Sequence, residues 1–253
     1  RAQAWLGDTG ILWALLPIAT FLGMFTAWRR FGRDDEAEES IPVRYTPPEG
    51  LTPAEVGTLA DERADLQDVT ATILDLAVRG VLSIEEIGTR HFFFFGSKDY
   101  RLRRERPDAG PLKAHEQRLL QGLFGGDEEV LVSELRNAFY TKLPAIRKAL
   151  YRELSGPGRY FPTSPEGVRT RWAFAGGALA VLGFAALITE AAPLPGVAAG
   201  LSSGGVVLAF SRVMPRRTRK GRRALQEIRG FEEFVRRADA DRLARLGGRT
   251  VEN

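Results

Sequence analysis

Residues 172–188 read WAFAGGALAVLGFAALI, a run without a charged side chain. Two further apolar runs occur in the chain: GILWALLPIATFLGMFTAW from about Gly10 to Trp28, and a run from about Val197 to Met214 in which Arg212 is the only charge. A helix that crosses a bilayer needs about 20 apolar residues at a rise of about 1.5 Å each. The three runs therefore predict three transmembrane helices. Packing them as buried helices of a soluble α protein would require a larger core than the remaining chain can cover.

The average composition hides this pattern and excludes several kinds of site. With 44% hydrophobic and 27% charged residues, the 253-residue chain has the averages of a soluble protein. Its 0 cysteines exclude disulfides, thiolate nucleophiles and Cys-based metal sites, and its 2 histidines exclude a His-rich metal centre. A net charge of +4 is too small to indicate nucleic-acid binding. The chain opens at Arg1 rather than Met, so we expect it to be a piece of a longer protein.

Basic residues beside the runs predict the orientation, because cytoplasmic flanks carry the excess of Lys and Arg. The turn Thr189–Gly196 has no basic residue. We therefore expect a multi-pass protein of the cytoplasmic (inner) membrane, with residue 1 outside and with residues 29–171 and the C-terminal tail in the cytoplasm. The flanking basic residues are Arg29, Arg30, Arg33, Arg169, Arg171, Arg216, Arg217, Arg219, Lys220, Arg222 and Arg223.

Two groups of residues in and beside the spans are candidates for contacts. Small residues let membrane helices approach closely, so Gly176, Gly177, Gly200 and Gly204 are candidates for packing the second and third spans or for an oligomer seam. Basic residues near a membrane surface attract anionic lipid. We expect that role for Arg216, Arg217, Arg219, Lys220, Arg222 and Arg223.

The rest of the chain divides by composition. The acidic run Asp34–Glu39 is either a solvated part of a tether or a contact for a basic partner such as the basic tail. The tail carries Leu225, Ile228 and Phe231 at helical spacing, which predicts an amphipathic helix. We expect these segments: 1–30 flank and first span, 31–52 linker, 53–165 cytosolic domain, 166–189 second span, 190–196 outward-facing turn, 197–214 third span, 215–253 tail.

The 53–165 segment has the element order of winged-helix units. Thr52 is expected to cap a helix that starts at Pro53, and Ser133 to cap a later one. The fold class that we predict is a mainly α membrane protein, with three transmembrane helices and an α+β winged-helix-like cytosolic domain. The expected helices are 66–79, 112–124 and 141–154, and the expected strands are 81–88, 91–95 and 99–105.

This domain does not favour nucleic acid as a partner. Its charges nearly cancel, and the helix before the expected hairpin exposes Gln67, Asp68 and Asp75 rather than basic groups. One helix, 141–154, has a basic face. The aromatic run Phe92–Phe95 is either buried within the domain or contacts the spanning hairpin or a second copy.

Catalytic motifs fail when they are examined residue by residue. His115-Glu116 begins like a zinc-protease helix, but Leu119 stands where the second His is needed, so we expect His115 to face solvent. No phosphate-binding loop or nucleophile elbow occurs. We therefore expect a protein that is not an enzyme, with no cofactor, no metal, no catalytic residue and no small-molecule substrate.

Several segments resemble one family. PPEGL at 47–51, PAEVG at 53–57 and DVTATILDLAVRG at 68–80 resemble the YciQ-like predicted membrane proteins of prokaryotes, the domain-of-unknown-function family numbered 2207. MPRRT at 214–218, Gly221 and Gly230-Phe231 are similar to its segment after the last span. The resemblance implies an exported β-rich domain before the first span, which agrees with an outward N-terminus. It implies no activity, cofactor or catalytic residue.

These observations lead to one leading function and one alternative. We expect a non-enzymatic interaction or signal-coupling module that links an exported domain to the cytosolic one. Its partners would be membrane lipids together with a protein partner or a second copy of the chain. The alternative is a membrane-tethered nucleic-acid-binding regulator.

Overall fold

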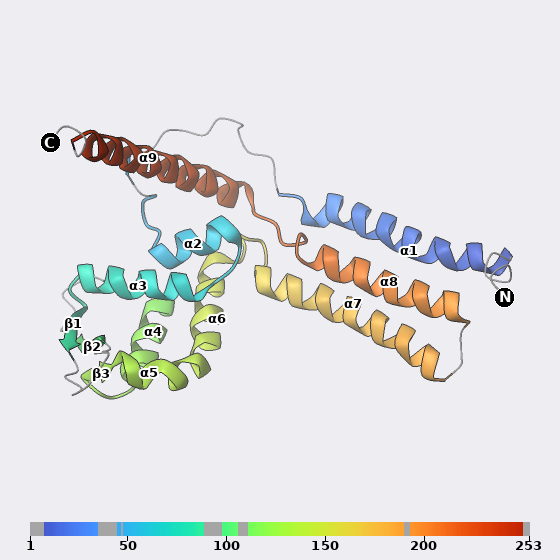
Figure 1. Ribbon diagram of the computed structural model, residues 1–253, viewed down its shortest axis with the longest axis horizontal. Helices are drawn as coiled ribbons and strands as arrows, with labels where there is room; N and C mark the ends of the chain where they lie inside the picture. The colour runs from blue at the N-terminus through green and yellow to red at the C-terminus, as the bar shows by residue number, and fades with distance from the viewer. Residues whose placement is uncertain are drawn as a thin grey trace. The chain divides into compact units, whose positions relative to one another are not determined.

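The computed structural model describes residues 8–34, 45–46, 48–88, 98–105, 111–189 and 193–249 (Figure 1). The chain divides into two compact units. The membrane unit comprises Arg1–Ala37 and Gly156–Arg222, and the α+β unit comprises Glu38–Ser155 and Arg223–Asn253. The expectation for Phe92–Phe95 falls outside the described residues.

Three helices of the membrane unit are long and apolar enough to cross a bilayer. The first candidate span, Leu12–Gly32, includes most of α1 (Asp8–Ala27) and the π-helical turn η2 (Trp28–Gly32). The other two are α7 (Pro165–Ile188) and α8 (Leu194–Ser211). α7 begins well before Trp172, because Ser164 caps it and Pro165 fits the first helical position. α8 ends before Met214, since a residue that precedes a proline disfavours helical geometry.

α8 is the central helix of the membrane unit. Of its apolar window, 39% is buried within the protein, against 6% for each of the other two spans. α7 and α1 both pack along α8, as Figure 1 shows. The lipid-facing helices are thus α1 and α7, while α8 supplies the shared surface between them.

Glycines allow α7 and α8 to approach backbone to backbone. A Cβ atom at Gly204 would lie 2.8 Å from the Gly176 carbonyl oxygen, and one at Gly200 would lie 3.1 Å from Gly183 Cα. Three of the glycines singled out in the sequence therefore lie in this contact. The fourth, Gly177, has nothing within 4 Å of its Cβ position, whereas Gly183 takes part although sequence reasoning passed over it.

α1 runs parallel to α8 in a constant register. The Trp13 ring lies 3.2 Å from the Cβ position of Gly196, near the start of both helices. At their other ends, the Cβ position of Gly32 lies 3.2 Å from the Met214 backbone. The number of residues between Trp13 and Gly196 is nearly the same as the number between Gly32 and Met214. The two helices therefore keep the same register along their length. Near these ends, Met24, Val207 and Met214 form a buried cluster.

Before residue 156, the described residues of the α+β unit form six helical segments and a small sheet. They are α2 (Pro53–Asp61), α3 (Leu66–Val78), α4 (Ala114–Phe124), α5 (Val132–Ala138), η3 (Phe139–Thr141) and α6 (Leu143–Leu154). Strands β1 (Leu82–Gly88), β2 (Lys98–Arg104) and β3 (Glu129–Leu131) form an antiparallel sheet in the order β1-β2-β3. The core includes Leu76, Leu82, Leu102, Leu119, Leu123 and Ile146.

Local sequence signals explain where most of these helices begin. Thr52 and Glu55 form the expected capping box of α2. The expectation that Ser133 caps a helix was wrong, because α5 already begins at Val132. Ser133 instead donates its hydroxyl to Asp99 Oδ2 at 2.6 Å, and Asp99 Oδ1 accepts the Ser133 backbone N–H at 3.2 Å.

The tail forms one long helix, α9 (Arg219–Arg249). Its first residues, up to Arg222, belong to the membrane unit, and the remainder belongs to the α+β unit. Leu225 and Ile228 are buried, as expected for the apolar face of an amphipathic helix.

Neighbouring glycines of α8 provide a test of the α7–α8 contact. Gly204→Ala places a methyl group against the α7 backbone and should lower the thermal midpoint of the purified protein in detergent. Gly205→Ala is the matched control, because nothing lies within 4 Å of its Cβ position. It should leave the midpoint unchanged or raise it, since Ala favours a helix over Gly by about 0.5–1 kcal/mol. Equal midpoints for the two variants, measured by circular dichroism, would contradict the packing.

Candidate functional site

Asp34 joins the chain that leaves the first span to the chain that leaves the third. Its Oδ1 atom accepts the backbone N–H of Arg217 at 2.6 Å. Its Oδ2 atom lies 3.4 Å from Nη1 of both Arg217 and Arg222. Arg217 is only 8% exposed. We call these three residues the Asp34 clasp. Of the two alternatives for the acidic run, Asp34 shows the contact with the basic tail, whereas residues 35–39 lie outside the described part of the chain.

The same segment is also tied to the chain that leads into α7. Thr218 donates its backbone N–H to the Tyr160 carbonyl at 3.0 Å and its hydroxyl to the Arg159 carbonyl at 2.7 Å. A Cβ atom at Gly221 would lie 2.2 Å from the Tyr160 oxygen, so glycine is required there. Lys220 Nζ lies 4.6 Å from the centroid of the Tyr160 ring. Flanking segments of all three spans therefore meet at one place, which we call the junction.

The junction divides the six basic residues that were expected to contact lipid. Arg217 is buried and Arg222 is half-buried, and both face Asp34. Arg216 is half-buried as well. Arg219, Lys220 and Arg223 are exposed and remain available to a charged surface.

A second group of polar residues lies inside the α+β unit, around His115. This histidine is 1% exposed, so the expectation that it faces solvent was wrong. Its Nδ1 atom bonds the Glu153 carboxylate, and its Nε2 atom lies 3.1 Å from the Thr52 hydroxyl oxygen. His115 lies one helical turn before Leu119, on the apolar face of α4, and that spacing was the signal that could have revealed its burial.

The carboxylates around His115 are paired. Glu55 is bonded by Lys113, whose ammonium group also donates to the Gly50 carbonyl at 2.7 Å. Glu116 is 0% exposed and is paired with Arg79. Burial alone raises the pKa of Glu153, but its bonds to His115 and to the Ala114 N–H outweigh burial, so the pKa lies below its ordinary value. We call Thr52, Glu55, Arg79, Lys113, His115, Glu116 and Glu153 the buried polar cluster.

Asp68 is a further buried carboxyl group of the α+β unit, so the expectation that α3 exposes it was wrong. Burial raises its pKa to about 6, although the Asp65 backbone N–H partly offsets this effect. A Cβ atom at Gly57 would lie 1.9 Å from Asp68 Oδ1, so the carboxylate occupies space that only glycine leaves open. Gly57 and Asp68 both belong to the segments on which the family resemblance was based.

Thr52, His115 and Glu153 have the order of a nucleophile, a base and an orienting acid. The contacts of Thr52 instead explain a structural role. Its oxygen accepts the Glu55 N–H at 3.4 Å, and its hydroxyl lies 3.2 Å from Glu55 Oε2, as in a helix cap. His115 is closed off from solvent. Thr52 caps α2, and Glu153 lies in the last turn of α6. Through His115, the cluster therefore connects the start of α2 to the end of α6.

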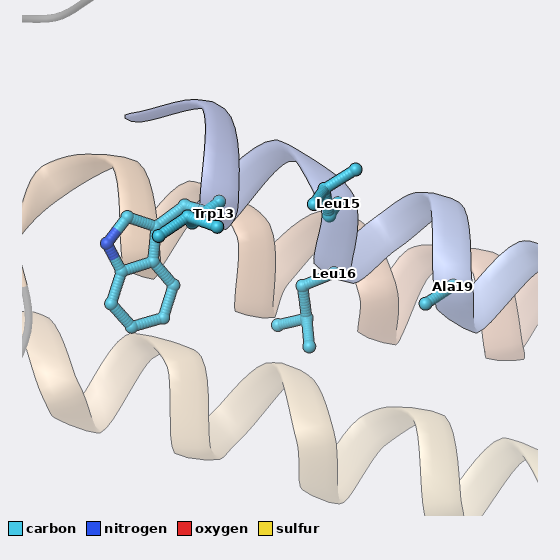
Figure 2. Close-up of a pocket in the computed structure, with 5 residues that line it drawn as sticks. Trp13, Leu15, Leu16 and Ala19 are labelled. Atoms are coloured by element: carbon cyan, nitrogen blue, oxygen red, sulfur yellow. The ribbon is translucent and has the colours of Figure 1, made fainter. Parts of the chain in front are cut away.

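The apolar pocket beside α1 offers no polar chemistry. It is lined by Leu12, Trp13, Leu15, Leu16 and Ala19, and Figure 2 shows Trp13 and Leu16 pointing away from the α1 axis toward the neighbouring helices. Among the described residues, no group of three or more His, Asp or Glu side chains is placed to hold a metal ion.

Three apolar helices, an attached α+β unit and a polar junction at the span ends define a multi-span membrane protein. The chain belongs to the family described as predicted membrane protein (DUF2207), C-terminal domain, whose family model matches residues 42–247. The resemblance seen in the sequence is thereby confirmed. No curated protein and no solved structure matches the chain.

Removing the imidazole of His115 tests the buried polar cluster. His115→Leu removes the bond between the imidazole and the Glu153 carboxylate and should destabilise the packing of α4 on α6 by about 2 kcal/mol. Amides of both helices should then exchange hydrogen about thirtyfold faster in the full-length protein. Gln121→Leu, on an exposed position of α4, is the control and should leave exchange unchanged. Similar exchange in both variants would show that the cluster does not hold the helices together.

Proposed function

We propose that this protein is a non-enzymatic signal-coupling module of the cytoplasmic membrane, which links an exported domain to the α+β unit in the cytosol. The observation that carries the proposal is the Asp34 clasp. It joins the end of the first span to the segment that follows the third, and thus a displacement of one span acts on a defined polar contact.

The distribution of charge supports the proposed orientation. Arg29 and Arg30 end the first span, Arg169 and Arg171 lie in the first turns of α7, and the Arg217–Arg222 segment follows α8. Arginine thus gathers at one end of all three helices. Under the positive-inside rule, that end faces the cytoplasm, and the opposite ends of the three helices face outward.

The route of coupling that we propose uses the junction and the buried polar cluster in turn. The chain enters α2 at Thr52, after the first span, and leaves α6 beyond Glu153, toward the second. His115 contacts both of these residues. A pull on either connection therefore acts on the contacts of one buried histidine.

The α+β unit is proposed to be winged-helix-like, with β1 and β2 as the wing after α3. In support, β3 pairs antiparallel with β2 to complete a three-stranded sheet. The exposed side of α3 carries Leu66, Leu74 at 55% exposure and Val78 at 88%. Apolar side chains suit a protein partner better than phosphate groups. For the alternative, a nucleic-acid-binding regulator, the supporting feature is the exposed basic side of α6, with Lys142, Lys148 and Arg152.

A double-mutant cycle tests the coupling. Gly196→Leu pushes the Trp13 end of α1 away from α8, because a Cβ atom there meets the indole ring at 3.2 Å. With the clasp intact, hydrogen exchange at the first turn of α2 should change in liposomes. In an Asp34→Asn background, the same substitution should have no effect there, because the clasp no longer transmits the displacement.

Gly205→Leu is the matched control for the added side chain, since nothing lies within 4 Å of that Cβ position. It should leave exchange in α2 unchanged. If Gly196→Leu changes α2 equally with and without Asp34, or does not change it at all, the clasp is not the coupling element.

A further inference from the structure

The Asp34 clasp has two unequal arms. Arg217 holds the carboxylate through a backbone N–H at 2.6 Å, and its side chain is 10% exposed. The guanidinium groups of both arginines lie 3.4 Å from Asp34 Oδ2, but Arg222 has no backbone bond to Asp34 among the described contacts, and its side chain is 35% exposed. An ion pair of this length and exposure contributes little, so Arg222 can leave Asp34 at small cost while Arg217 stays in place.

The position of the clasp brings it close to the membrane surface. Asp34 follows shortly after Gly32, where the first candidate span ends. Arg222 lies in the first turn of α9, and its neighbours Arg219, Lys220 and Arg223 are exposed. Among the described residues, Asp34 is thus shared by two guanidinium groups, and three further basic side chains lie exposed beside them in the sequence.

A phosphate group can bind these basic side chains in competition with the Asp34 carboxylate. A guanidinium group forms two parallel hydrogen bonds to phosphate oxygens, and anionic lipid at a surface attracts each nearby basic residue. Because the basic segment starts where a span ends, the nearest phosphate groups are those of the lipid headgroups around the spans. A site for a soluble phosphate compound would not need to lie at the end of a span.

We propose that Arg222 is shared between Asp34 and the phosphate group of an anionic phospholipid, so that anionic lipid loosens the clasp. This inference rests on the proposed coupling role of the clasp and adds its regulation by lipid. Arg217 keeps the first and third spans in register in both states. Asp34 and the headgroup therefore compete for one guanidinium group.

The competition can be measured as lipid affinity. The probe is phosphatidylglycerol binding to the full-length protein in detergent, followed by native mass spectrometry, with phosphatidylcholine as the uncharged comparison. Asp34→Asn should raise the affinity for phosphatidylglycerol about fivefold, the effect of freeing one cation. In an Arg222→Gln background, Asp34→Asn should have no effect.

Arg223→Gln is the matched control, because it removes one exposed charge next to Arg222 but none from the clasp. The fivefold effect of Asp34→Asn should persist in that background. An equal effect of Asp34→Asn with Arg222→Gln and with Arg223→Gln would reveal a general charge effect and overturn the proposal. So would the absence of any effect of Asp34→Asn in the otherwise unchanged chain.

Soluble glycerol 3-phosphate distinguishes the two sources of phosphate. It should not displace phosphatidylglycerol at equal concentration, and displacement would overturn the assignment to lipid. The double-mutant cycle with Gly196→Leu, which is followed by hydrogen exchange, uses liposomes of a single lipid composition and does not depend on lipid competition. Failure of the lipid competition is therefore distinguishable from failure of the coupling itself.

Discussion

The parallel packing of α1 on α8 is the constraint on which the other contacts of the membrane unit depend. Because the two helices advance together from Trp13–Gly196 to Gly32–Met214, Asp34 arrives beside Arg217. The opposite side of α8 has glycines where α7 approaches, so one helix carries both neighbours. In lipid, where apolar surfaces gain little by meeting, such close backbone contact is what holds helices together.

The α+β unit uses buried charge in a different way. A buried pair of a carboxylate and a cation rarely adds stability compared with an apolar pair. It does favour one arrangement of the two groups over others, because separating them leaves a buried charge without a partner. Glu55, Glu116 and Glu153 each have a partner from another part of the unit. The start of α2 and the end of α6 are thereby fixed against α4, as the coupling role that we propose requires.

The sequence was sufficient for features that depend on local pattern. Long apolar runs marked the three apolar helices, and capping residues with apolar periodicity marked α2 and α3. Small residues marked the α7–α8 contact, yet they could not fix the rotation of each helix. For that reason Gly177 was singled out where Gly183 lies in the contact.

Features that depend on contacts between residues far apart in the sequence could not be predicted from the sequence. The spacing of His115 and Leu119 could indicate that His115 is buried, but not that Thr52 and Glu153, from the cap of α2 and from α6, satisfy both of its ring nitrogens. Nothing within α4 itself supplies those partners. From the sequence, the acidic run is either solvated or paired with the tail. Asp34 is paired because the register of α1 on α8 brings it beside Arg217. Burial of polar groups is thus a property of the assembled fold.

Disulfide formation between introduced cysteines tests the α1–α8 register most directly, because the chain contains 0 native cysteines. The end contacts place Thr20 level with Ser203, which is buried on α8. In native membranes, Thr20→Cys with Ser203→Cys should cross-link readily. Leu22→Cys with Ser203→Cys should not, because Leu22 is 55% exposed on another side of α1. Equal cross-linking of both pairs, or none in the first pair, would contradict the account.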